Sequence, residues 1–265
     1  MTDAAAIAPT PRAADAEIAA RALACLDLTD LTDSCGEAEI ETLCARAQTP
    51  HGPVAAVCVW PRFVALSKER LARSRVAVAT VVNFPYGMER VKPVAAETER
   101  AVADGADEID VVLPYRAFAE GRVDAAARLL YAARGAAGGR LLKVILETGM
   151  LREPGLIRRA ADLAISEGAD FIKTSTGKVE VNATPEAARL MLEAIAASGR
   201  KVGLKAAGGV KTLADARAYL ELADEVMGAG WAAPETFRFG ASGLLGALLE
   251  ALGEPSEAPG PAGAY

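Results

Sequence analysis

The 265-residue chain contains 52% hydrophobic and 24% charged residues, which suits one barrel-sized domain and argues against a second large domain. Its net charge is −6 with Lys and Arg dispersed along the chain, so the basic stripe of a nucleic-acid-binding protein is excluded. The longest apolar runs, such as 54–60, are too short to span a bilayer, and the N-terminus lacks the basic segment of a signal peptide. We therefore expect no membrane and no nucleic-acid partner.

The chain order predicts one domain between two tails. Residues 1–13 and 253–265 are expected to be flexible tails, the second rich in Pro, Gly and Ala and ending in Tyr265. The domain over 14–252 begins with an extra helix at about 15–26. Eight β-rich segments follow, at 55–59, 76–82, 108–113, 141–147, 171–175, 202–206, 225–227 and 237–240. Helical spacing occurs at 37–47, 62–72, 91–103, 122–136, 154–167, 184–198, 212–222 and 242–252.

The alternation of these segments predicts the fold class. Successive strands in the middle of the chain start roughly 30 residues apart, the length of a βαβ unit with a parallel crossover. A weak repeat supports the pattern, because D-G-A-D at 104–107 and E-G-A-D at 167–170 each close a helix and open a strand. Eight such units predict an α/β fold, a (β/α)₈ TIM barrel with an additional N-terminal helix. An open doubly wound sheet is the rival architecture.

Four charges stand inside predicted strands, where a barrel packs branched side chains. They are Asp110, Lys143, Lys173 and Lys205. Period-two alternation separates each of them from apolar neighbours that can pack outward, so all four are expected to converge in the barrel lumen. A purely structural ion-pair network is the alternative, but three lysines to one carboxylate leave cations in excess.

An excess of cations can make a lysine reactive. An ordinary lysine has a pKa of about 10.4, and lowering it by roughly 3 units requires about 4 kcal/mol. Burial and a neighbouring ammonium can supply this, so Lys205 beside Lys173 is a plausible route to a neutral, nucleophilic amine. Metal chemistry is less economical, because His51 is the single histidine and no zinc site can be built from it.

Three glycine-rich turns at strand ends offer backbone amides to a phosphate group. They lie at 174–178, 206–211 and 239–243, the last directly before the final helix. Gly177-Lys178 is not a nucleotide P-loop, because the earlier glycine of that motif is missing and Val179 replaces Ser or Thr. A single glycine-rich turn more often has only a structural role. The three turns together favour a phosphate-binding site.

Several motifs resemble deoxyribose-phosphate aldolase over residues 21 to 250. The resemblance rests on F-I-K-T-S-T-G at 171–177 with N-A-T-P at 182–185, K-A-A-G-G-V at 205–210, E-I-D-V-V at 108–112 and D-L-T at 27–29. It implies a class I aldolase that reversibly cleaves 2-deoxy-D-ribose 5-phosphate into acetaldehyde and D-glyceraldehyde 3-phosphate, with no cofactor and no metal. Small phosphosugars and aldehydes would be its substrates, and a homodimer is expected by analogy.

The resemblance also implies roles for particular residues. Lys173 would form the Schiff base, Lys205 would assist it, and Asp110 would act as acid and base through water. The terminal Tyr265 would help to protonate the enamine carbon. Substrate-channel residues would be Asp27, Thr29, Cys58, Lys143 and Thr176. Phosphate contacts would come from Gly177, Lys178, Gly208, Gly209 and Ser242.

Two departures from the family pattern concern binding rather than chemistry. Ser242 is followed by Gly243 where some members have two serines, and Trp60 stands where tyrosine is common. Another phosphate-binding barrel enzyme, such as a different lysine aldolase or an isomerase, and a silent phosphosugar-binding protein stay open as alternatives. The four cysteines include no C-x-x-C pair, which favours reduced thiols and a cytoplasmic location.

Overall fold

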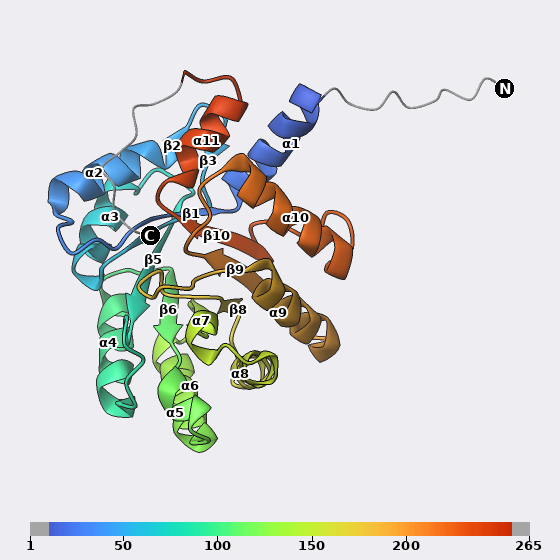
Figure 1. Cartoon of the computed structure of the whole chain (residues 1–265). Helices are drawn as coiled ribbons and strands as arrows, with labels where there is room; N and C mark the ends of the chain where they lie inside the picture. The colour runs from blue at the N-terminus through green and yellow to red at the C-terminus, as the bar shows by residue number, and fades with distance from the viewer. Residues whose placement is uncertain (1–10, 256–265) are drawn as a thin grey trace.

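The computed structural model describes residues 11–255, which form a closed barrel of eight parallel strands ringed by helices (Figure 1). The barrel order is β1-β10-β9-β8-β7-β6-β5-β4, and β1 closes the ring by pairing with both β10 and β4. The strands are β1 Leu26–Asp30, β4 Ala56–Val59, β5 Ala77–Val82, β6 Glu108–Val112, β7 Leu141–Ile145, β8 Phe171–Lys173, β9 Gly203–Ala207 and β10 Phe237–Ala241. The predicted (β/α)₈ barrel is confirmed, and the open sheet is excluded.

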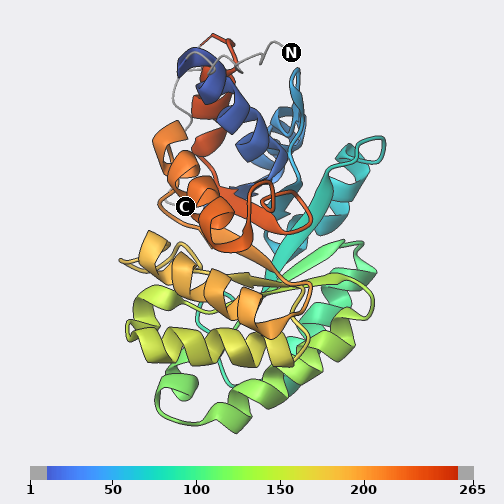
Figure 2. The same cartoon turned by 90° about the vertical axis from the view of Figure 1, so that its right-hand side faces the viewer.

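Helices follow the barrel strands and cover them from outside. The main ones are α2 Glu37–Arg46, α3 Val64–Arg70, α4 Val91–Ala103, α6 Val123–Ala137, α8 Pro154–Ser166, α9 Pro185–Ser198, α10 Leu213–Met227 and α11 Leu244–Ala251. Shorter elements are η1 Pro61–Phe63, α5 Tyr115–Ala119, α7 Thr148–Leu151 and the antiparallel pair β2 Gln48–Thr49 and β3 Gly52–Pro53. Figure 2 shows α8 and α9 side by side on the outside of the barrel. Their apolar faces pack on the outward side chains of the strands.

One predicted strand is wrong, and one strand of the barrel was not predicted. The segment 225–227 is not a strand, because α10 runs on through it to Met227. The eighth strand is β1 instead, whose Leu26 and Leu28 pack in the main core while Asp27 and Thr29 occupy the alternate positions. This strand was not predicted because polar residues at every second position interrupt the apolar run that marks the other strands.

The N-terminal helix is present but is shifted from its predicted range. Helix α1 spans Pro11–Ala24 rather than 15–26, so it begins inside the segment predicted to be a tail. Proline is well tolerated in the first turn of a helix, where its missing N–H has no partner to lose. The helix packs against α10 and α11.

The two D/E-G-A-D segments act as predicted at the joints between helix and strand. Gly105 and Gly168 adopt φ of +102° and +89°, directly after α4 and α8. The aspartate that follows each one then accepts a hydrogen bond from a neighbouring strand, Asp107 from the Val78 N–H at 2.9 Å and Asp170 from the Leu142 N–H at 2.8 Å. These contacts set where β6 and β8 begin beside their neighbours.

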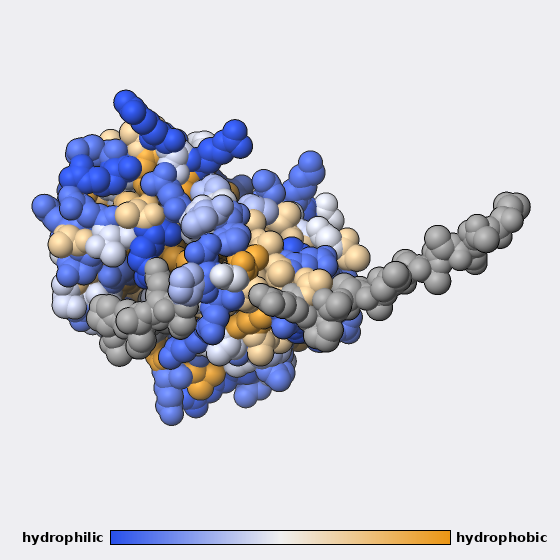
Figure 3. All heavy atoms as spheres, turned by 90° about the horizontal axis from the view of Figure 1, so that it is seen from above, coloured by the Kyte–Doolittle hydropathy of each residue, from blue (hydrophilic) through white to orange (hydrophobic). Residues whose placement is uncertain are grey.

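The inward-facing side chains divide the barrel interior into two halves. On β4 and β5 they are small and apolar, and Ala56, Cys58, Ala79 and Val81 form a cluster separate from the main core. On β6 to β10 and on β1 the interior carries charge, as described below. The outer surface seen in Figure 3 is mostly hydrophilic with small apolar patches. Within residues 11–255 no helix is both long enough and apolar enough to cross a membrane.

Candidate active site

Charged side chains occupy one half of the barrel interior. Lys143, Lys173, Lys205 and Asp110 all lie there and are fully buried, as the sequence predicts. Three further charged residues are buried with them, which the sequence analysis does not count among the interior charges: Asp27, Glu108 and Arg238. The four predicted charges do converge, but the set is incomplete: the described barrel holds seven charged side chains in one connected network.

Strand register brings the cations side by side. Lys173 of β8 is the register partner of Lys205 on β9, and Lys205 is the partner of Arg238 on β10. On the other side, Asp110 of β6 is the partner of Lys143 on β7. Paired residues of neighbouring strands project to the same face, so these side chains meet inside the barrel. Gly240 makes room for them, because a Cβ there would come within 2.9 Å of Lys205 Cε.

Asp110 is the shared partner of the three lysines. Its Oδ2 accepts hydrogen bonds from Lys173 Nζ at 3.0 Å and from Lys205 Nζ at 2.9 Å. Its Oδ1 accepts one from Lys143 Nζ at 2.8 Å. Two buried amines therefore meet at a single carboxylate oxygen.

Arg238 links the remaining carboxylates. Its guanidinium donates to Asp27 Oδ1 at 2.7 Å and to Glu108 Oε1 at 2.9 Å. Lys143 Nζ lies 2.5 Å from Glu108 Oε2, and Lys205 Nζ donates to Asp27 Oδ2 at 2.6 Å. Every carboxylate of the network thus has at least two cationic partners, as buried ion pairs require.

The sequence contained signals for these missed residues. Glu108 stands two positions before Asp110, so the same alternation places both on one face of the strand. Arg238 stands inside the predicted strand 237–240. Glu108 and Arg238 can therefore be identified by considering every charged residue in the predicted strands, and not only those between apolar runs.

The network sets the charge states of its members. Burial alone would raise the pKa of Asp110, but Lys143, Lys205 and Lys173 outweigh it and hold that pKa well below its usual range. Asp27 behaves alike, because Lys205 and Arg238 overcome its desolvation and lower its pKa. For Lys143, burial is outweighed by Asp110 and Glu108, which raise the pKa of its ammonium. Lys143 is therefore held protonated and is a poor nucleophile.

The other residues predicted for the substrate channel are buried around this network. Thr29 of β1 is the register partner of Cys58 on β4, and its hydroxyl donates to the Asp27 carbonyl at 2.8 Å. Burial raises the pKa of the Cys58 thiol, so it is protonated at neutral pH. Thr176 follows β8 and is also buried.

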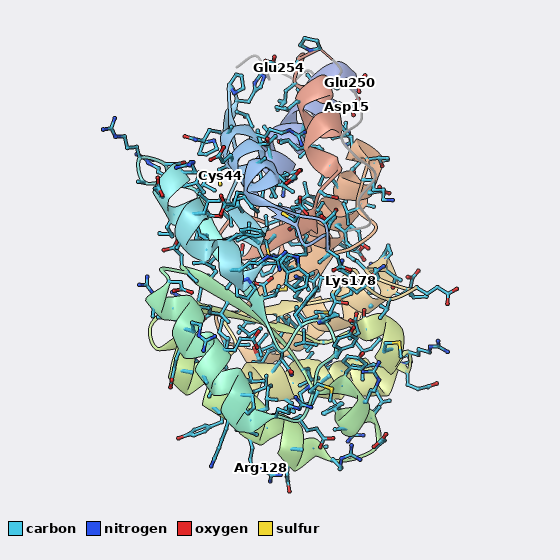
Figure 4. All side chains as sticks on the ribbon, turned by 90° about the vertical axis from the view of Figure 1, so that its left-hand side faces the viewer. Asp15, Cys44, Arg128, Lys178, Glu250 and Glu254 are labelled. Carbon is cyan, nitrogen blue, oxygen red and sulfur yellow. The ribbon has the colours of Figure 1, made fainter. Side chains whose placement is uncertain are left out.

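The residues predicted for phosphate lie on loops after neighbouring strands. Gly177, Gly208 and Gly209 adopt φ of +80°, +83° and +87°, a conformation that favours glycine. A Cβ at Gly208 would come within 2.7 Å of Asn182 Cβ, so the two loops are in close contact. Exposed Lys178, labelled near the middle of the molecule in Figure 4, reaches across to the loop after β1 and donates from Nζ to the Leu31 carbonyl at 2.8 Å. Ser242 is half-buried directly after β10.

Glu147 is a further buried carboxylate that the sequence analysis missed. It follows β7 and contacts Thr176, with Oε2 2.5 Å from the hydroxyl oxygen and Oε1 3.2 Å from the backbone nitrogen. Its place at the carboxyl end of the predicted strand 141–147 was the available signal, because catalytic groups of barrel enzymes lie at the carboxyl ends of their strands.

Two residues considered in the sequence analysis, Tyr265 and His51, are not part of the described site. Tyr265 is outside the described residues, so its predicted role stays a prediction. His51 lies on the outer surface and bonds Glu254 at 3.0 Å. Between residues 11 and 255, no cluster of three His, Cys, Asp or Glu side chains is arranged to hold a metal ion. A cavity of about 700 Å³ lies outside the barrel between α9 and α10, lined by Arg189 and Glu225 among others, and contains none of the predicted site residues.

Known proteins are similar to this chain in sequence and in fold. Deoxyribose-phosphate aldolase of Agrobacterium fabrum is 55% identical over 246 residues, covering 91% of this chain and 95% of the relative. The structure of a candidate deoxyribose-phosphate aldolase from Coccidioides immitis matches with a TM-score of 0.78 at 32% identity, covering 92% of this chain and 88% of that one. One from Toxoplasma gondii matches with a TM-score of 0.83 at 25% identity, covering 91% and 96%. Residues 18–246 match the model of the DeoC/LacD family aldolases. The chain belongs to this family of aldolases.

Proposed function

We propose that this protein is a class I aldolase that reversibly cleaves 2-deoxy-D-ribose 5-phosphate into D-glyceraldehyde 3-phosphate and acetaldehyde, with Lys173 as the Schiff-base lysine. The observation that carries the proposal is the pair of buried amines, Lys173 and Lys205, on the same oxygen of Asp110. The identity to the Agrobacterium fabrum aldolase supports the substrate.

The proposed roles of the two amines follow from their shared partner. Two ammonium groups at one buried oxygen repel each other, so protonating both is unfavourable. Within the described part of the chain, the network joins four cationic side chains to three carboxylates, so it carries an excess positive charge unless one amine is neutral. Lys143 is held charged by its carboxylates, and Lys205 contacts both Asp27 and Asp110. We assign the neutral, attacking amine to Lys173, as the resemblance of the F-I-K-T-S-T-G motif at 171–177 implies.

The proposed reaction runs through an iminium ion. Neutral Lys173 adds to C1 of the open-chain sugar, and loss of water from the carbinolamine gives the iminium. The bond between C2 and C3 then breaks, its electron pair moving toward the iminium nitrogen to form an enamine. Asp110, acting through water and aided by Lys205, takes the proton from the C3 hydroxyl as that carbon becomes the aldehyde of glyceraldehyde 3-phosphate. Protonation at C2, with Tyr265 as the proposed donor, and hydrolysis release acetaldehyde.

Binding is assigned to the residues around the network. The phosphate would contact Gly177, Lys178, Gly208, Gly209 and Ser242, close to the N-terminus of α11, whose unpaired N–H groups favour an anion. Asp27, Thr29, Cys58, Lys143 and Thr176 would line the path from the phosphate to Lys173. No metal and no organic cofactor is assigned a step.

A coupled assay tests the proposal directly. The purified protein is incubated with 2-deoxy-D-ribose 5-phosphate, and released glyceraldehyde 3-phosphate is detected by a dehydrogenase that reduces a nicotinamide cofactor. We expect turnover that depends on the protein and on the 5-phosphate. Binding of the sugar phosphate without product would favour the silent binding protein, and turnover of a different phosphosugar alone would favour another barrel enzyme.

The role of Lys205 predicts a shift in pH dependence. In Lys205→Leu, the repelling ammonium is lost while Asp110 stays, so a proton on Lys173 becomes more favourable. We expect the pH midpoint of imine formation with acetaldehyde to rise by about one unit or more, measured by the rate of borohydride trapping. Lys201→Leu, which replaces an exposed residue two positions before the same strand, is the control and should leave the midpoint unchanged. An unchanged midpoint in Lys205→Leu would remove the proposed role.

A cytoplasmic location and a homodimer are further parts of the proposal. The location is supported by the four cysteines, all buried and none of them in a disulfide, as is usual in a reducing compartment. The structure of a deoxyribose phosphate aldolase from Aeropyrum pernix, 20% identical with a TM-score of 0.71, is described as a tetramer, so a tetramer is the alternative outcome. Light scattering of the purified protein would give its mass in solution.

A further inference from the structure

Glu147 adopts a strained backbone conformation at the end of β7. Its φ of 59° and ψ of 58° lie in the left-handed region, which a residue with a long side chain rarely enters. Such strain persists where surrounding contacts enforce it, and it is concentrated at functional sites. Here the flanking residues are fixed by β8 and its extension, because the Leu146 N–H bonds the Lys173 carbonyl and the Thr148 N–H bonds the Thr174 carbonyl, both at 2.9 Å. The strained residue thus lies between two bonds to the strand that carries Lys173.

The contacts of Glu147 explain what this conformation achieves. Its carboxylate accepts from both the hydroxyl and the backbone N–H of Thr176. The Thr176 hydroxyl oxygen in turn accepts from the Lys178 N–H at 3.1 Å. A chain of hydrogen bonds therefore runs from Lys178 through Thr176 to Glu147, and it encloses Gly177, whose φ is +80°. The carboxylate determines the direction of the Thr176 hydroxyl proton and holds the turn that follows β8.

Burying the Glu147 carboxylate destabilises the folded protein. The side chain is fully shielded from solvent, and burial raises the pKa of Glu147 despite the opposing effects of Thr176, Lys173 and Arg116. Folding therefore destabilises the ionised form. A neutral side chain in this place would have a smaller desolvation penalty. A costly carboxylate in a strained residue beside the catalytic lysine is the pattern of a group kept for function.

We propose that Glu147 is a positioning residue that fixes Thr176 and the Gly177-Lys178 turn for binding the phosphate of the substrate. The inference rests on the proposed function, because it takes these residues as phosphate and substrate contacts. It adds a residue that follows β7 to a phosphate site otherwise assigned to the loops after β8, β9 and β10. Its effect falls on substrate binding more than on the chemical step at Lys173.

Steady-state kinetics of Glu147→Gln and Glu147→Ala test this role. The amide oxygen of glutamine can accept one of the two bonds from Thr176, whereas alanine accepts neither. We expect KM for 2-deoxy-D-ribose 5-phosphate to rise about tenfold in Glu147→Ala and less in Glu147→Gln, with kcat changed by less than about threefold. With unphosphorylated 2-deoxy-D-ribose, kcat/KM should change much less. Glu153→Gln, an exposed glutamate near the same loop, is the matched control.

Thr176→Val provides a second, independent variant if the Glu147 variants fold poorly. It keeps the side-chain shape and removes the hydroxyl, so it should raise KM for the phosphorylated sugar in the same way. The double variant Glu147→Ala/Thr176→Val should be little worse than Glu147→Ala alone, because both act through one contact. Fully additive effects, equal losses on phosphorylated and unphosphorylated sugars, or an unchanged KM would each overturn the proposal. If wild-type protein labels at Lys173 with borohydride while these results are negative, only the role of Glu147 fails.

Discussion

Lys173→Leu is expected to lower kcat/KM for 2-deoxy-D-ribose 5-phosphate by at least about 10⁴-fold, because no other group can take over the covalent step. Lys205 and Lys143 cannot replace it, since each ammonium is held against two carboxylates or more. The loss should appear in the coupled assay at saturating substrate, as a fall in kcat rather than a rise in KM.

The same variant should fold as well as the wild type. Asp110 keeps Lys143 and Lys205 as partners after Lys173 is removed, so its buried carboxylate stays paired with two cations. We expect an equal or higher midpoint of thermal unfolding, because polar groups kept for function often lower the stability of the fold. Lys92→Leu, which replaces an exposed lysine of α4, should retain full activity. An inactive Lys173→Leu with a much lower midpoint would show that the lysine is structural.

Asp110→Asn is expected to separate imine formation from bond cleavage. The amide keeps the shape of the side chain but cannot act as a base, so kcat should fall by about 10²-fold to 10⁴-fold. Imine trapping at Lys173 should persist, because removing a negative charge from beside the amines disfavours their protonation. Parallel measurements of turnover and of borohydride trapping check this, and loss of both in a folded variant would contradict the assignment.

Asp110→Asn should also destabilise the protein. Three lysines contact the carboxylate in the buried interior, so its loss should cost roughly 3–5 kcal/mol in urea unfolding. Asp162→Asn, which removes an exposed pair with Arg158, should cost no more than about 0.5 kcal/mol.

The pH dependence of this difference follows from the pKa of Asp110. Because folding lowers that pKa, the carboxylate stabilises the fold above the unfolded value of about 3.9, and the contribution is lost as the pH falls toward the folded value. The stability difference between wild type and Asp110→Asn should therefore be constant near neutral pH and shrink below about pH 4.

Much of the barrel could be predicted because its helices and most of its strands follow simple periodicities. Helix α4 occupies the predicted range 91–103, and the predicted Lys173, Lys205, Lys143 and Asp110 do meet inside the barrel. Alternation alone was enough to place each of these side chains on the inner face.

Other features could not be read from local pattern. In β1 the interior positions are Asp27 and Thr29, so the strand lacked the apolar run that marks its neighbours. At 225–227 the sequence fits a strand, but α10 continues because its face still packs in the core. The sharing of one Asp110 oxygen depends on the register of β6, β8 and β9, which only the closed barrel fixes. Glu147 reaches Thr176 through a backbone conformation that no sequence rule assigns to glutamate.

Reductive trapping of the wild-type protein tests the central claim most directly. The protein is mixed with 2-deoxy-D-ribose 5-phosphate at neutral pH, reduced with borohydride, digested and mapped by mass spectrometry. The account predicts a stable secondary amine on the peptide containing Lys173, and one carrying the two-carbon fragment once cleavage has occurred. Label on Lys205, Lys143 or any other residue, or no label at all, would contradict it.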